Sequence, residues 1–246
     1  MESERITSVA LLKNVMAVTE AMEHAMARPG HLPGLVCMHG FSGLGKSYSA
    51  IFVAAEHRAY FVQARSTWTR KAMLLAVLKE MGIEPERTIP EMVDQIAEQL
   101  AASRRPLIID ETDHLVERGL IEVVRDIHES APGCTILLIG EEGLPGKLAK
   151  FERVHGRILD WVAAQPADME DAKLLRSFYC KRVQVTDELL ARIHRVSNGS
   201  ARRICVNLER VQEMGASEGK REMDLAAWGD RAFYTGEAPT RRQGAR

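Results

Sequence analysis

Eight residues, Gly40-Phe41-Ser42-Gly43-Leu44-Gly45-Lys46-Ser47, constrain the fold of this chain more than any other feature. They match the pattern G-x-x-x-x-G-K-[ST] at every fixed position. In this pattern the glycines let the backbone close around phosphates, the lysine reaches the β- and γ-phosphates, and the hydroxyl joins a Mg²⁺ shell. The apolar run Leu35–His39 precedes the loop, and a helical pattern over Ser47–Glu56 follows it. The sequence therefore predicts a strand, a phosphate-binding loop and a helix whose amino terminus faces the anion. We include Tyr48 in the predicted nucleotide-binding set.

An acidic pair follows a second short apolar run. Leu107–Ile109 lies between Pro106 and Asp110, which leaves too little room for a helix and favours a buried strand. A carboxylate at the end of such a strand can hold Mg²⁺ through water. A second carboxylate beside it can polarise an attacking water molecule. We therefore assign Ser47 and Asp110 to Mg²⁺ and Glu111 to catalysis. The alternative is a strand that simply ends in solvated charges.

Apolar runs alternate with helical patterns throughout residues 1–165. Further strands are expected at 59–63, 134–139 and 158–162. Further helices are expected at 8–27, 69–81, 90–102, 115–130 and 147–154. This alternation predicts an α/β core with a parallel five-stranded sheet that is covered by helices on both faces.

The pattern changes after Gln165-Pro166, where only helical patterns remain. Helices are expected at 168–179, 186–197, 200–214 and 224–234. We therefore expect a small all-helical lid over residues 166–235. Residues 236–246 contain Pro, two Gly and three Arg, which predicts a disordered basic tail.

Charge, cysteine content and hydropathy narrow the class of protein. The net charge of -1 gives no global field for a nucleic-acid partner, so any such surface must be local. The four cysteines form no C-x-x-C pair, and Cys37 and Cys134 lie in apolar runs, which predicts reduced core residues. No apolar stretch approaches the roughly 20 residues of a membrane helix. Met1–Arg5 lacks the pattern of a signal peptide, so we expect a cytoplasmic protein without a membrane partner.

The glycine loop, the acidic pair and the helical lid together resemble the AAA+ superfamily over residues 8–235. This resemblance implies a Mg²⁺-dependent ATPase with ATP and Mg²⁺ as cofactors. The segment Gly199–Arg203 resembles the family's second sensor, which implies that Arg202 reaches the γ-phosphate. Arg157, or Arg153 one helical turn earlier, lies where the family places an arginine that acts on a neighbouring subunit's nucleotide. Exposed helical arginines without a catalytic role are the alternative at all three positions.

One position departs from the family pattern. After the strand at 134–139 the family usually offers Asn, Thr or Ser, whereas this chain reads Gly140-Glu141-Glu142. Glu141 is a candidate for orienting water, although a carboxylate near the γ-phosphate is repulsive unless a cation pairs with it. The departure predicts slow hydrolysis or a need for a partner.

Within the superfamily, the chain resembles the MuB-like target-DNA activators of Mu-type transposing phages. The similar stretches are 64–69, 73–74, 106–111 and 202–203. The resemblance implies an ATPase in a bacterial host cell that self-associates into a ring or helical filament on double-stranded target DNA and activates a transposase.

A local basic cluster is the candidate DNA contact, because Lys and Arg neutralise phosphates and Thr can hydrogen-bond to them. Its residues are Arg65, Thr67, Arg70 and Lys71. A solvated start of a helix is the alternative. Two other functions stay open for the whole chain: a nucleotide-gated switch of a secretion system, and a helicase-loader or clamp-loader-like subunit. The sequence leaves open the stoichiometry, the partner and any DNA sequence preference.

Overall fold

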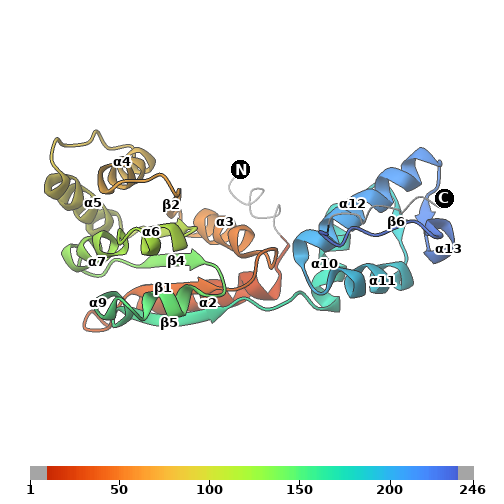
Figure 1. Ribbon diagram of the computed structural model, residues 1–246, viewed down its shortest axis with the longest axis horizontal. Helices are drawn as coiled ribbons and strands as arrows, with labels where there is room; N and C mark the ends of the chain where they lie inside the picture. Colours follow the sequence, from red (N-terminus) through yellow and green to blue (C-terminus); the bar gives the residue numbers. More distant parts are fainter. Residues whose placement is uncertain (1–9, 238–246) are drawn as a thin grey trace, which may run out of the picture. The chain divides into compact units, whose positions relative to one another are not determined.

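The computed structural model describes residues 10–237, and the chain divides into two compact units, Met1–Gln165 and Pro166–Arg246. Figure 1 draws unit 1 in red through green and unit 2 in cyan to blue. The predictions for Met1–Arg5 and for most of the basic tail lie outside the described residues.

Unit 1 is built on a five-stranded parallel sheet with the order β2-β3-β4-β1-β5. The strands are β1 (Leu35–His39), β2 (Tyr60–Gln63), β3 (Leu107–Asp110), β4 (Ile136–Gly140) and β5 (Ile158–Ala163). The predicted five-stranded parallel sheet is confirmed. β4 lies between β1, which leads into the glycine loop, and β3, which ends in Asp110.

Helices cover both faces of this sheet, because successive side chains of each strand point to opposite faces. Val36 and Met38 of β1 pack with α2 (Lys13–Ala27) and α3 (Lys46–Glu56). Leu35 and Cys37 belong to the larger core on the other face. The helices of that face are α4 (Arg70–Met81), α5 (Ile89–Ser103), α6 (Asp113–Glu117), α7 (Ile121–Ser130), α8 (Leu144–Leu148) and α9 (Glu152–His155). The result is a three-layer α/β unit (Figure 1).

Two predicted helices are wrong as single elements. The helix expected at 115–130 is divided into α6 and α7, because Gly119 adopts a left-handed conformation with φ +67°. The helix expected at 147–154 is divided into α8 and α9. Phe151 leaves the helical conformation between them and packs against the core.

Unit 2 contains α10 (Met169–Tyr179), α11 (Asp187–Ser197), α12 (Ala201–Ser217) and α13 (Leu225–Trp228). The side chains of Asp168, Thr186 and Ser200 cap the first three helices. The prediction of a purely helical unit is wrong, since β6 (Gln184–Val185) and β7 (Glu222–Met223) pair in parallel. The helix expected at 224–234 ends at Trp228, because the next residue, Gly229, has φ +63°.

All four cysteines are free, and Cys37 and Cys134 are buried as predicted. Burial raises the pKa of both thiols, so these groups stay protonated. No helix within residues 10–237 is both long enough and apolar enough to cross a membrane.

Candidate nucleotide-binding site

The glycine loop joins β1 to α3 and has the backbone of an anion cradle. Gly43 and Gly45 have φ +85° and +90°, a region that side chains disfavour. A Cβ atom at Gly40 would lie 2.9 Å from the Cβ of Ala164, so the loop can pass there only as glycine. Gly45 occupies the N-cap of α3, and no side chain caps this helix. The first amides of α3 therefore suit an anion.

Lys46 is the cation of this cradle. Its ammonium donates hydrogen bonds to the carbonyl oxygens of Gly40 at 2.5 Å and Phe41 at 2.9 Å. Burial lowers the pKa of Lys46, and four nearby carboxylates oppose that shift. These carboxylates belong to Asp110, Glu111, Glu141 and Asp113. Three of these acids, Asp110, Glu111 and Glu141, were predicted at this site, and Asp113 was not.

Asp110 and Glu111 form a tight acidic turn after β3. Asp110 is buried, and its Oδ1 accepts the backbone N–H of Glu111 at 2.9 Å. Glu111 is half-buried and has φ +56°, a left-handed conformation that costs a residue with a Cβ about 1–2 kcal/mol. The backbone N–H of Thr112 donates to the carbonyl of Ile139 at 2.8 Å and ties the turn to β4. This bond helps to hold Glu111 in its strained conformation.

Sequence reasoning missed Asp113, which anchors the turn after β4. Its Oδ2 accepts the backbone N–H of Glu141 at 2.7 Å, and its Oδ1 pairs with the ammonium of Lys147 at 2.8 Å. A Cβ atom at Gly140 would lie 2.3 Å from Asp113 Oδ2, so this contact requires glycine. The signal in the sequence was a third acid directly after the strand. Asp113 fixes the backbone of Glu141, which replaces the polar residue expected there.

The remaining residues of the predicted nucleotide set lie at the start of α3 and the tip of the loop. Ser47 is exposed on the first turn of α3, where its hydroxyl is accessible to a metal ion. Phe41 is 67% exposed. Tyr48 has a structural contact, because its hydroxyl accepts the backbone N–H of Ala10 at 2.5 Å. Sequence reasoning also missed Asn14 of α2, whose buried side chain donates to the carbonyl of Leu44.

Arg157 lies at the amino ends of the strands, whereas the glycine loop lies at their carboxyl ends. It directly precedes β5, whereas the loop follows β1, and the two strands are parallel. Five strand residues span roughly 16 Å, so Arg157 cannot reach the glycine loop of its own chain. Arg157 pairs with the carboxylate of Glu129 at 2.9 Å. Arg153 is exposed on α9 and has no ion pair within the described part of the chain.

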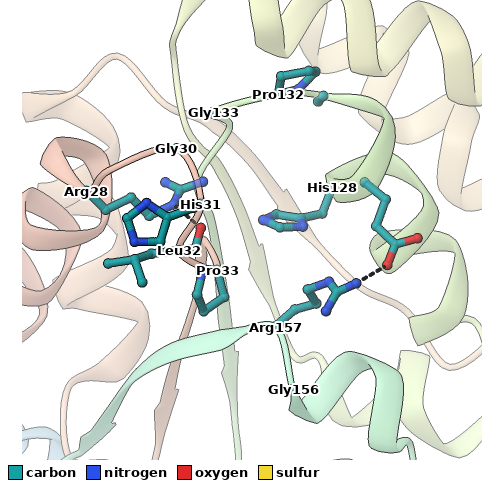
Figure 2. A pocket seen from close by; sticks show the side chains of 12 residues that line it. Arg28, Gly30, His31, Leu32, Pro33, His128, Pro132, Gly133, Gly156 and Arg157 are labelled. Atoms are coloured by element: carbon teal, nitrogen blue, oxygen red, sulfur yellow. Dashed lines mark hydrogen bonds and ion pairs between the residues drawn. The ribbon is translucent and has the colours of Figure 1, made fainter.

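Arg157 also lines a pocket of about 460 Å³ at the amino ends of β1, β4 and β5. Figure 2 shows Arg157 and His128 on one side of this pocket and Arg28 and His31 on the other. Neither ring nitrogen of His128 has a hydrogen-bond partner among residues 10–237. Burial, followed by the charges of Arg28 and Arg157, lowers the pKa of His128 to about 4. His128 is therefore neutral at pH 7.

The basic cluster predicted for DNA lies at the carboxyl end of β2. All four residues of this cluster are exposed: Arg65, Thr67, Arg70 and Lys71. The two arginines and the lysine have no ion pair within residues 10–237. The backbone N–H of Ala64 donates to the carbonyl of Asp110 at 2.8 Å, so the segment begins beside the acidic turn. Trp68, within the same segment, is half-buried and packs against the core.

Arg202 belongs to unit 2, on the exposed side of the first turn of α12. The Ser200 cap accepts the neighbouring N–H of Arg203 at 3.4 Å and fixes the start of this helix. The role of Arg202 at the γ-phosphate stays a prediction.

The strand order β2-β3-β4-β1-β5, the glycine loop after β1 and the acidic turn after β3 define the AAA+ P-loop ATPase fold. Residues 30–148 match the family model described as "AAA domain". A search of curated proteins finds no significant match.

Solved structures with similar folds share little sequence with this chain. The ORC2 protein of Aeropyrum pernix, in ADPNP-ADP complexes, is 16% identical over 87% of this chain and 65% of its own, with a TM-score of 0.68. The Aeropyrum pernix ORC1 protein in complex with DNA is 16% identical over 87% and 62%, with a TM-score of 0.63. The Thermotoga maritima RuvB Holliday junction branch migration motor is 19% identical over 90% and 70%, with a TM-score of 0.62. The chain thus spans about two thirds of the length of these structures.

Proposed function

We propose that this protein is a Mg²⁺-dependent ATPase that assembles with copies of itself and acts on DNA. The observation that carries the ATPase proposal is the geometry around Lys46. The ammonium of Lys46 lies against two carbonyl oxygens of an uncapped glycine loop, and the charges of the carboxylates that follow the neighbouring strands β3 and β4 act on it. The nucleotide complexes of the ORC2 structure, which has a similar fold, support the same ligand.

The residues present fit Mg²⁺ as a nucleotide-borne ion. No group of three or more His, Cys, Asp or Glu side chains in residues 10–237 forms a metal cage. Mg²⁺ does not need one, because it is usually held by one or two carboxylates, substrate phosphates and water. Ser47 and Asp110 would hold it here, and the ion would neutralise charge on the phosphates.

Lys46, Glu111 and Glu141 each have a distinct proposed role. Lys46 binds the β- and γ-phosphates, and Glu111 accepts hydrogen bonds from the attacking water. Glu141 lies close enough to Lys46 to interact with its charge, which offsets the repulsion between this carboxylate and a phosphate. Glu141 therefore takes the water-orienting role that the family usually gives to a polar residue.

In this proposal, self-association supplies the arginine that a single chain cannot bring to its own glycine loop. Arg157 and Arg153 lie near the amino end of β5, too far from their own glycine loop to stabilise charge on its phosphates. A head-to-tail neighbour would bring one of them to the loop of the next copy. Arg157 must then leave Glu129, an exposed pair of the kind worth only about 0–1 kcal/mol. Arg153 needs no such exchange.

The DNA part of the proposal rests on Arg65, Thr67, Arg70 and Lys71. Three exposed cations without ion pairs in the described part of the chain are free to contact phosphates. The ORC1 structure in complex with DNA and the RuvB branch migration motor, with similar folds, support the same class of partner. Each copy offers few contacts, so affinity requires several aligned copies. Activation of a transposase is the finer proposal, and it rests on the sequence resemblance of residues 64–69 and 106–111.

Nucleotide binding and turnover test the ATPase proposal. We expect the wild type to bind a fluorescent ATP analogue and to release phosphate in the presence of Mg²⁺. Lys46→Ala should lose binding, because the phosphates lose their cation. Glu111→Gln should bind normally but release phosphate at least about 100-fold more slowly, the size of a lost general base. Phosphate release by Lys46→Ala at the wild-type rate contradicts the proposal.

Sedimentation with DNA tests the second part. Arg70→Glu combined with Lys71→Glu should abolish ATP-dependent pelleting of DNA while nucleotide affinity stays unchanged, because both residues lie outside the glycine loop. Binding should weaken steeply with salt, since released counterions drive it. A lack of ATP-dependent DNA binding at low salt and high protein concentration would instead favour a nucleotide-gated switch for a protein partner.

A further inference from the structure

We propose that Asn14 is a positioning residue that orients the Leu44–Gly45 peptide for phosphate binding and connects it to Gln165. This inference rests on the proposed nucleotide-binding function. Asn14 lies on α2, outside the glycine loop and outside the acidic turn. Gln165 is the last residue of unit 1 and directly precedes Pro166, where unit 2 begins.

The side chain of Asn14 is almost completely buried and makes three hydrogen bonds. Its Nδ2 donates to the carbonyl of Leu44 at 2.9 Å and to the carbonyl of Gln165 at 2.8 Å. Its Oδ1 accepts the backbone N–H of Gln165 at 2.8 Å. Both amide hydrogens and the amide oxygen are therefore used, and only 7% of the residue is exposed. A polar group is buried this deeply only when such partners are in place.

The bond to Leu44 fixes the direction of one peptide plane. The carbonyl of Leu44 and the N–H of Gly45 belong to the same peptide group, and in a trans peptide they point in opposite directions. Asn14 holds the carbonyl toward α2, so the N–H of Gly45 points away from α2. This peptide plane turns about ψ of Leu44 and φ of Gly45, and Gly45 has φ +90°, a region that glycine enters and leaves easily. Without the Asn14 bond, this peptide would be free to turn its carbonyl toward a bound phosphate.

The beginning of the loop packs against the residue next to Gln165, Ala164. Gly40 packs so closely on Ala164 that a Cβ atom there would lie 2.9 Å from the Cβ of Ala164. The backbone N–H of Ala164 donates to the carbonyl of His39 at 2.8 Å. Residues 164 and 165 thus contact the beginning of the loop directly and its centre through Asn14. A phosphate that orders the loop should therefore also order the backbone of Gln165.

A second buried asparagine provides a matched control. Asn207 of α12 in unit 2 donates to the hydroxyl of Ser197 at 3.3 Å and to the carbonyl of Tyr234 at 3.0 Å. Its Oδ1 accepts the backbone N–H of Tyr234 at 2.7 Å. Asn14→Leu and Asn207→Leu each remove three hydrogen bonds from a buried amide of similar shape. Only the first variant alters a contact to the glycine loop.

The test combines nucleotide affinity with hydrogen exchange in the full chain. The first measurement is the Kd of a fluorescent ATP analogue for wild type, Asn14→Leu and Asn207→Leu. The second is the exchange rate of the Gln165 amide, which donates to Asn14 Oδ1, with and without the analogue. We expect nucleotide to slow exchange at Gln165 in the wild type and in Asn207→Leu. In Asn14→Leu that slowing should disappear and Kd should rise about tenfold, the effect of one lost oriented hydrogen bond.

Each outcome bears on the inference. An Asn14→Leu variant that melts earlier but keeps wild-type affinity and the nucleotide effect at Gln165 overturns it, since Asn14 would then be only structural. If Asn14→Leu does not fold, the wild type alone decides: nucleotide binding without slower exchange at Gln165 also overturns the inference. Absence of nucleotide binding in the wild type would instead overturn the proposed function, and this inference with it.

Discussion

Glu111→Gly should make the protein more stable and catalytically inactive at once. Glu111 has φ +56°, which costs a residue with a Cβ about 1–2 kcal/mol. Glycine removes this strain but loses about 0.5–1 kcal/mol more backbone entropy on folding. The two backbone hydrogen bonds of residue 111, to Asp110 Oδ1 and from the N–H of His114, survive the change. The net gain therefore lies between about 0 and 1.5 kcal/mol, which raises Tm by up to roughly 6 °C for a unit of this size.

Removal of the Glu111 carboxylate also relieves repulsion in the acidic cluster, so a second variant must separate charge from backbone. Glu111→Gln removes the charge and keeps the strained conformation. Arg104→Gly relieves the same kind of strain at φ +57°, far from the cluster, and should leave phosphate release unchanged. Thermal unfolding followed by circular dichroism compares the variants. If Glu111→Gly unfolds at or below the temperature of Glu111→Gln, the strain argument is wrong.

Three further predictions concern other parts of unit 1. Folding lowers the pKa of His128 from 6.5 to about 4, so the unfolded state takes up a proton on this side chain at a higher pH than the folded state does. The free energy of unfolding should therefore fall as the pH drops from 6.5 to 4. His128→Phe should flatten that part of the pH profile of urea denaturation. Gly140→Ala should cost about 1–3 kcal/mol in chemical denaturation, because the new methyl group would lie 2.3 Å from Asp113 Oδ2. Lys46→Ala and Arg157→Ala should each be inactive alone, but an equal mixture should recover about a quarter of wild-type phosphate release. In random head-to-tail contacts, about a quarter place an intact glycine loop next to an intact arginine. If Arg157→Ala alone stays active and the mixture shows no recovery, Arg153 is favoured instead.

The sequence was sufficient for the sheet and the loop, because strong local signals mark both. β1 was predicted at the same five residues that form it, since an apolar run lies between Gly34 and Gly40. The helix at 115–130 failed for a local reason. Its apolar period continues across Gly119, so the pattern of Leu115 and Ile121 does not show that the glycine between them turns left-handed.

Contacts between distant segments were beyond the reach of local patterns. β6 and β7 have two residues each, too few for any periodicity to appear. Asp113 meets Glu141 only because β4 is inserted beside β3, and the strand order is not encoded in spacing. Asn14 was visible as a polar residue one turn before Val18 on an apolar helix face. Its partner Gln165 lies at the far end of unit 1, so no local pattern connects the two residues.

The parallel sheet itself divides the proposed chemistry between two chains. Parallel strands place all carboxyl ends at one edge, and there the chain gathers Lys46 and the acidic turn around Glu111. The same geometry places Arg157 at the opposite edge, beside Glu129 and the pocket of His128. No rearrangement of side chains brings these two edges together within one unit. If the arginine is needed for hydrolysis, turnover must depend on the contact between copies. The basic segment at Arg70 and Lys71 lies at the same end of the strands as the acidic turn. DNA bound there would lie beside the contact between copies, which would link DNA binding to turnover.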